Sequence, residues 1–440
     1  MKLEKLYLSR NKMKIFFKVI IIGIFFLGFD ESKANTLFES LQSAYLNNSK
    51  LNAERASMRA SREEKREAIS EFLPSVTISG YKSQQDNFNS NSDDLGIDPK
   101  ERSILVEQKI FQGFGGVANL QKKRKGQKLG EFKLKKAEQE ILLEAAKVHT
   151  ELFLNKKKVN INLSNVDLLE RQVETDQNRL EKGEISLTDL SQSESSLAGA
   201  RAQLIAAKND LITSKANFEK IIGKKLTDES IEVLTQNNLN LPESLAVAYK
   251  ISSFENPDLQ ITILEYEQSK LDVAIAGSEL SPSATISYKR AEQDDISSTI
   301  QARTQETVTA TATWPIFSGG KNAFNYRKFQ QIKNQKELLV EDQKKTTKAE
   351  VVTAWSSYQS SKSVLDSIIS QVKAAEIANE GITLEYESGT TRTTLEVIQS
   401  RSILLNSRIN LASSERNFLI SQFNLLSAVG RLTAKHLNLQ

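Results

Sequence analysis

An internal repeat of about 207 residues limits what this chain can fold into more than any other feature. The segment Glu71–Ser79 (EFLPSVTIS) returns as Glu279–Ser287 (ELSPSATIS). Three further pairs keep the same order: Phe111–Gly113 with Phe317–Gly319, Lys182–Gly183 with Ser388–Gly389, and Ile221–Gly223 with Ala428–Gly430. Each copy reads as helix, strand, polar loop, strand, very long helix, glycine-marked turn and returning helix. We therefore expect two repeats, at residues 35–240 and 241–440.

The N-terminus has the pattern of a secretory signal peptide. Residues 1–18 are rich in lysine, and an apolar run of eleven residues follows from Val19 to Phe29. Ser32-Lys33-Ala34 then offers small residues at the two positions that a signal peptidase reads. Eleven apolar residues are too few for a membrane-spanning helix, which needs ~20. We expect export, with residues 1–34 removed.

Four segments alternate apolar and polar residues with a period of two, at 72–83, 102–112, 280–290 and 304–317. In the last segment Val308, Ala310 and Ala312 alternate with threonines. Such alternation predicts strands with one apolar and one wet face. A soluble amphipathic sheet would show the same periodicity. Export, the length of about ten residues and the aromatic ends favour strands of a membrane barrel.

Four strands cannot close a barrel. Small barrels need about eight strands, and an open sheet edge in hydrocarbon would leave backbone N–H and C=O groups without partners. If these strands enter a membrane, several copies must share one sheet. Three copies would supply twelve strands, so the membrane hypothesis requires an oligomer.

The predicted helices are longer than a globular domain can use. No proline occurs between Gly116 and Glu181, or between Lys321 and Ser388. At 1.5 Å per residue, each stretch could extend roughly 100 Å.

The returning helices carry a seam of small and large residues spaced alternately three and four apart. The seam is Leu190, Ser193, Leu197, Ala200, Leu204, Ala207, Leu211, Ser214, Phe218 and Ile221 in the first copy, and Val397, Ser400, Leu404, Ser407, Leu411, Ser414, Phe418, Ser421, Leu425 and Ala428 in the second. Heptad spacing sustained over four repeats predicts coiled-coil packing. We therefore expect antiparallel hairpins at 115–223 and 320–430, turning at Gly183 and Gly389.

Composition argues against catalysis. The chain has no cysteine, and its two histidines, His149 and His436, are far apart in sequence. Thiolate chemistry is thereby excluded, and neither a metal site nor a cofactor site is predicted. We expect His149 to be a solvated residue on a long helix. The basic run Lys122–Lys125 lacks aromatic stacking partners, so we expect a helix surface near the membrane rather than nucleic-acid binding.

Taken together, these residues resemble one family, the TolC-like outer membrane efflux proteins. The resemblance spans the mature chain and includes Thr36–Ser40 (TLFES), Leu73-Pro74, Ile316–Gly320 (IFSGG) and Tyr386–Thr390 (YESGT). It implies a mainly α fold with membrane β structure: a homotrimeric twelve-stranded β-barrel, four strands per chain, continued by a long α-helical coiled-coil barrel across the periplasm. It also implies contact with outer-membrane lipid, a periplasmic adaptor (membrane fusion) protein and an inner-membrane transporter of the RND, MFS or ABC type.

The resemblance places a gate at the helix turns. Carried over by position, Asp189 would lie near the constriction, while Tyr386 and Arg392 look like the tyrosine and arginine that hold the entrance closed. Glu396 stands where an acidic pore-lining residue is expected, and Gln399 replaces a second such acid. The arginine comes one residue later than in the family pattern. A tyrosine or arginine bonded to a carboxylate on a neighbouring helix would hold the hairpins inward.

The function expected from these features is a passive exit duct of a tripartite efflux or type I secretion system. A second class stays open at the level of sequence. It is a periplasmic coiled-coil protein with a structural or adhesive role, whose strands form a soluble sheet.

Overall fold

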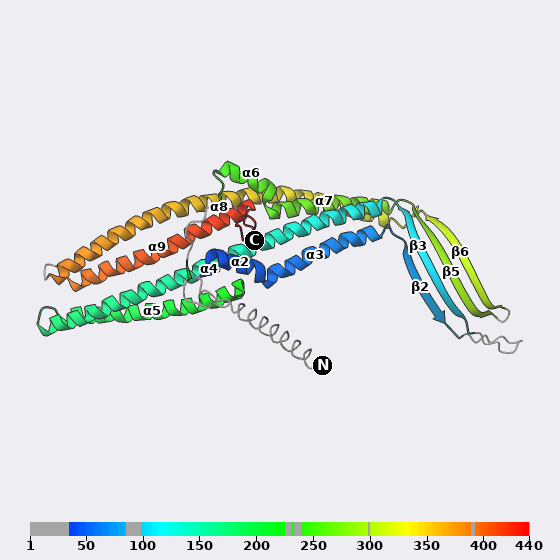
Figure 1. Ribbon diagram of the computed structural model, residues 1–440. Coiled ribbons are helices and arrows are strands. Elements are labelled where there is room, and N and C mark those ends of the chain that lie inside the picture. The colour runs from blue at the N-terminus through cyan, green and yellow to red at the C-terminus, as the bar shows by residue number, and fades with distance from the viewer. Residues whose placement is uncertain are drawn as a thin grey trace, which may run out of the picture.

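The computed structural model describes residues 35–84, 98–224, 231–232, 239–297, 300–388 and 392–439. The expected signal peptide therefore lies outside the described residues. The molecule is elongated, with a sheet at one end and two helical hairpins whose turns lie at the other (Figure 1). In the described ranges, helices long and apolar enough to cross a membrane are absent.

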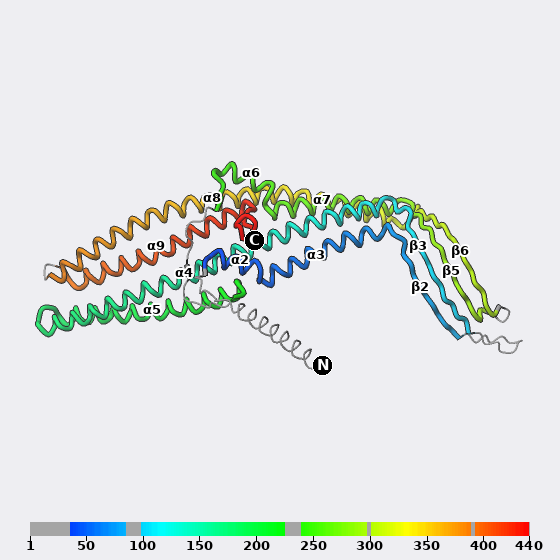
Figure 2. Tube along the Cα trace, viewed as in Figure 1, coloured from blue at the N-terminus to red at the C-terminus, as the bar shows by residue number. Residues whose placement is uncertain are grey.

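The two halves have matching helices. The first half contains α2 (Leu37–Asn47), α3 (Ser49–Ser70), α4 (Gly115–Glu181) and α5 (Leu187–Ile222), and the second contains α6 (Leu245–Glu255), α7 (Pro257–Ser278), α8 (Lys321–Glu387) and α9 (Thr394–Val429). Their lengths agree pair by pair, at 11, 22, 67 and 36 residues. The prediction of two structural repeats is confirmed, and Figure 2 lets the reader follow both along the chain.

One antiparallel sheet combines both halves in the order β2-β3-β5-β6. Its strands are β2 (Ser75–Lys82), β3 (Lys100–Gln112), β5 (Ser283–Ser297) and β6 (Ile300–Thr313). The apolar face is open in the single chain, where Ile78 is 77% and Val308 73% exposed. A short parallel pair, β1 (Asn35–Thr36) with β4 (Ile231–Glu232), ties the start of the described chain to the segment between the repeats.

Proline sets the strand bounds, and here the sequence prediction needs correction. The strands expected at 72–83 and 280–290 begin only at Ser75 and Ser283, each directly after a proline. The strand expected at 304–317 ends at Thr313, because Pro315 has no N–H to donate to a ladder. Residues 291–297 and 300–303, which lie between the two predicted strands, instead extend β5 and β6.

The hairpin helices begin and end at residues with local reasons to do so. Ser186 and Thr393 open α5 and α9 with reciprocal capping boxes to Asp189 and Glu396. Both helices end at a glycine with positive φ, Gly223 or Gly430. Between the caps, most of the predicted seam of each returning helix is buried against its outgoing partner, as coiled-coil packing requires.

The largest core lies near the middle of the helical body, where α2, α4, α5 and α9 meet the last residues of the described chain. Leu37, Phe423 and Leu432 are fully buried there. His149 belongs to this core, with no exposed surface and with Nδ1 2.9 Å from Ser40 Oγ. The expectation that His149 is solvated was wrong, because that face of α4 is covered by α2 and α5.

Ion pairs join the helices that continue the sheet. The basic run of α4 faces carboxylates on α3 and α7. The pairs are Lys122–Asp272 at 2.6 Å, Lys123–Glu64 at 2.8 Å, Lys125–Glu267 at 2.5 Å and Lys136–Asp258 at 2.5 Å. α3 is strongly polar, so this region is held largely by polar contacts.

Candidate functional site

A buried tyrosine connects the two hairpins close to their turns. Tyr386, on the last turn of α8, is 4% exposed and donates a hydrogen bond from Oη to Oδ1 of Asp176 at 2.8 Å. Asp176 lies near the end of α4, in the other half of the chain. The contact therefore links hairpin α4–α5 to hairpin α8–α9 at the end remote from the sheet (Figure 1).

Three donors surround the Asp176 carboxylate, which has no exposed surface. Besides Tyr386, Gln172 Nε2 donates to Oδ1 at 2.8 Å and Ser193 Oγ donates to Oδ2 at 2.5 Å. The three side chains come from α8, α4 and α5. A buried carboxylate is tolerated only with such partners, and the bonds from Tyr386 and Ser193 also join α8 and α5 to α4.

The surroundings of Tyr386 keep its hydroxyl protonated. Burial is the main cause that raises the pKa of the phenol; the hydrogen bond with Thr394 opposes this, and the neighbouring Asp176 raises the pKa further. The Arg179 guanidinium stacks over the tyrosine ring at 4.5 Å from its centre. Tyr386 is therefore a neutral donor at physiological pH, with Arg179 against its ring and Asp176 at its hydroxyl group.

A second link between the hairpins lies further from the turns. Arg401 on α9 donates from Nη1 to the Leu168 carbonyl oxygen of α4 at 3.4 Å. Closer to the core, Lys157 pairs with Glu415 at 2.6 Å. These contacts continue the junction of α4 and α9 along their length.

Arg392 lies in the second turn and pairs within its own hairpin. Its Nε is 2.6 Å from Glu385 on α8, and its Nη1 is 3.0 Å from Glu396 on α9. These bonds raise the pKa of the guanidinium, with Glu385 contributing most. The pKa of Glu396 is lowered, chiefly by the Thr393 backbone N–H and then by Arg392. Within one chain, Arg392 therefore closes the α8–α9 turn rather than joining the two hairpins.

The remaining predicted residues lie in the turns or in the first turns of the helices that follow them. Asp189 is engaged by Ser186 in the cap of α5, which lowers the pKa of its carboxyl group. Gln399 lines a cavity of about 170 Å³ between α8 and α9, together with Glu396. Gly183 adopts a φ of 75° in the first turn, which only glycine takes readily. Gly389 lies outside the described residues.

Sequence analysis missed Asp176, which makes the central contact with Tyr386. A signal for it was present, since Val166, Leu169, Val173 and Asp176 on α4 are spaced alternately three and four residues apart, as in the seams of the returning helices. A carboxylate at a seam position is buried by the coiled coil, so it must find donors.

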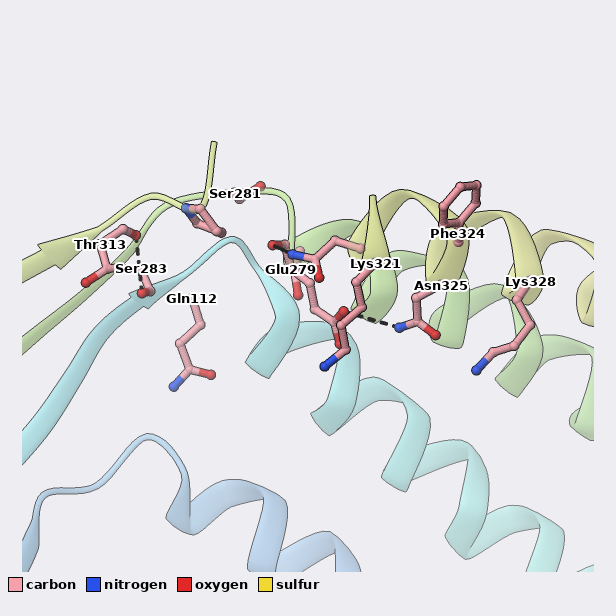
Figure 3. A pocket seen from close by; sticks show the side chains of 12 residues that line it. Gln112, Glu279, Ser281, Ser283, Thr313, Lys321, Phe324, Asn325 and Lys328 are labelled. Carbon is pink, nitrogen blue, oxygen red and sulfur yellow. Dashed lines mark hydrogen bonds between the residues drawn. The ribbon is translucent and has the colours of Figure 1, made fainter. Parts of the chain in front are cut away.

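A cavity lies at the opposite end of the molecule, where the sheet meets α8. It measures about 980 Å³ and is bordered by polar residues of the β3, β5 and β6 ends (Figure 3). Lys321, Phe324 and Lys328 of α8 also line it. The described residues contain no group of three His, Cys, Asp or Glu side chains suited to holding a metal ion.

Comparison with known proteins gives one consistent result. The sequence model of the family described as "Outer membrane efflux protein" matches residues 40–224 and 250–431. The outer membrane efflux protein BepC of Brucella suis is 25% identical over 415 residues, covering 92% of this chain and 88% of BepC. The outer membrane protein TolC of Escherichia coli is 21% identical over 432 residues, covering 95% of this chain and 87% of TolC.

Solved structures agree on the fold. The CmeC outer membrane channel of Campylobacter jejuni superposes with a TM-score of 0.81 at 14% identity, covering 90% of this chain and 86% of CmeC. The CusC structure gives a TM-score of 0.80 at 15% identity, covering 90% of this chain and 92% of CusC.

Proposed function

The chain belongs to the outer membrane efflux protein family, and we propose on this premise that it is the exit duct of a tripartite efflux or type I secretion system. It is an outer membrane protein with a periplasmic helical extension, and it is not an enzyme. As the exit duct it forms a passive channel from the periplasm to the exterior, gated at its periplasmic helix turns. The periplasmic structural or adhesive role left open by the sequence is not favoured by this family.

The sheet supports a trimer. β2 and β6 each pair on one side only in the described chain, so a single copy would expose two ladder edges to lipid. Its apolar face, which includes Ile78 and Val308, has the character of a lipid-facing surface. Three copies joined edge to edge give twelve strands, with the serine- and threonine-rich face turned towards the lumen.

The helices support a duct that reaches far into the periplasm. α4 and α8 each contain 67 residues, which corresponds to about 100 Å of helix. Their far ends are the natural place for contact with a periplasmic adaptor and, through it, an inner-membrane transporter of the RND, MFS or ABC type. The cargo is selected by that transporter in this scheme.

The contact between Tyr386 and Asp176 supports a gate at the turns. It is a buried hydrogen bond that connects the hairpins near their tips, so breaking it removes this link between α8–α9 and α4–α5 close to the turns. Arg392 and Glu396 stiffen the second turn, and Asp189 caps the start of α5 in the first hairpin. Contacts of this kind contribute only a few kcal/mol per subunit, which docking of an adaptor could outweigh.

The single observation that carries the proposal is a four-stranded sheet with unpaired edges, built continuously onto four long helices. The test is recovery of heat-labile trimers from the outer-membrane fraction, followed by current measurement in planar lipid bilayers. Trimers that conduct ions would support the duct. A water-soluble monomer that neither binds detergent nor conducts would overturn it.

A further inference from the structure

We infer that two ion pairs join one copy of this chain to the next, Lys328 with Glu64 of the partner subunit and Asp342 with Lys50 of the partner subunit, at positions that match two ion pairs between the chain's own halves. The inference rests on the proposed trimeric channel. Inside one chain, α4 of the first half packs on α7 of the second. Because the helices match in length, α8 of one copy and α3 of the next are the corresponding pair, and both are uncovered on that side.

The first residues of matching helices show which positions correspond. Residue 115 at the start of α4 corresponds to residue 321 at the start of α8, and residue 49 of α3 corresponds to residue 257 of α7. In the sheet, Glu107 of β3 lies opposite Ser287 of β5. The same register at the open edges sets Thr313 of β6 opposite Ser79 of the partner subunit. Both positions belong to the hydroxyl-bearing face of the sheet, so this closure keeps the apolar face continuous around the barrel.

The first ion pair follows from Lys122 and Asp272, which are 2.6 Å apart between α4 and α7. The corresponding positions are Lys328 on α8 and Glu64 of the partner subunit. Lys328 is exposed and forms no ion pair with any residue that the structure describes. Glu64 is 52% exposed at its side chain and uses one oxygen for Lys123, leaving a second oxygen to accept.

The second ion pair has its charges exchanged. Lys136 on α4 pairs with Asp258 on α7 at 2.5 Å. The corresponding residues are Asp342 on α8 and Lys50 of the partner subunit. Lys50 pairs with Glu140 of its own chain at 3.2 Å, and its side chain is still 64% exposed. A repeated sequence alone would keep the same signs. Complementarity that survives an exchange of signs indicates that the two positions face one another.

Uncovered residues mark the same face. A Cβ added at Gly113 would meet Ser281 at 2.5 Å, whereas one at Gly319, the matching residue of the second half, would meet no described atom within 4 Å. Ala118 on α4 is 9% exposed, but the matching Phe324 on α8 is 63% exposed. Lys321 replaces the close-packed Gly115, so the contact between copies is wider at this joint, beside the cavity of Figure 3.

Cysteine cross-linking tests the register, because the chain contains no cysteine. Directly opposed residues of antiparallel strands lie within disulfide range. Thr313→Cys with Ser79→Cys should give covalent trimers on non-reducing gels of oxidised membranes. β2 and β6 lie at opposite edges of one sheet, so the bond must join two chains. Thr309→Cys with Ser79→Cys, on the same face but four residues away, should give none.

Charge exchange tests the ion pairs. Lys328→Glu and Glu64→Lys should each lower the temperature at which trimers dissociate, and the double variant should restore it in part, because Glu64→Lys also breaks the ion pair with Lys123 of its own chain. The pair Asp342→Lys and Lys50→Asp should behave in the same way. Conducting trimers with neither cross-link nor rescue would overturn this interface while leaving the duct intact. Absence of trimers and of conductance in the unaltered protein would instead overturn the proposed function.

Discussion

Removing one hydroxyl group should open the gate. Tyr386→Phe keeps the buried ring but deletes the 2.8 Å hydrogen bond to Asp176. A hydrogen bond to a charged group contributes about 1.5–3 kcal/mol. Asp176 retains Gln172 and Ser193 as donors, so the chain should still fold. Since each 1.4 kcal/mol is a factor of ten, the opening equilibrium should shift by roughly 10- to 150-fold per subunit.

The assay is single-channel recording of reconstituted trimers in planar bilayers, with open probability as the readout. A matched control is Tyr358→Phe, since Tyr358 lies on the same helix and stacks on Phe418 within one hairpin. This control should leave the open probability unchanged. If Tyr386→Phe forms stable trimers whose open probability equals that of the unaltered protein, the bond does not hold the hairpins together.

Three further predictions concern the turns. Arg392→Ser removes both carboxylate contacts of the second turn and should raise the conductance of bilayer-inserted trimers, but less than Tyr386→Phe, because these contacts lie within one hairpin. The folded-state pKa of Glu396 lies below its ordinary value of 4.5. The ionised carboxylate therefore stabilises the second turn fully at neutral pH, and this stabilisation is lost as the pH falls through the folded-state pKa. Open probability should therefore rise on acidification, and Glu396→Gln should flatten this component of the pH profile. Hydrogen exchange followed by mass spectrometry should be faster in α8–α9 than in α4–α5, and equal rates would contradict the difference in packing on which this expectation rests.

Periodicity predicted the repeat and the helical seams because both depend on which face of an element is covered. Alternation of apolar and polar residues did not predict where the strands end. Pro315 lacks a backbone N–H and stops the hydrogen-bond ladder of β6, although the alternation continues past it. His149 and Asp176 show the limit of the method. Both lie on faces of α4 that are buried by other elements, and α8, which supplies Tyr386, is about two hundred residues away in sequence. A one-dimensional pattern shows that a position is covered but does not identify the element that covers it.

The two hairpins differ in the side chains that line the space between their helices, and this difference favours α8–α9 as the moving part. In α4–α5, Val166 and Leu169 pack on Leu204 in an apolar cluster. Between α8 and α9, by contrast, lies a cavity of about 610 Å³ lined mainly by serine and asparagine. Apolar burial contributes about 25 cal/mol per Å², so the serine-rich hairpin has less to lose on bending. Because Tyr386 belongs to α8–α9, the hairpin with the serine-lined cavity, its bond to Asp176 restrains the element that would otherwise move most easily.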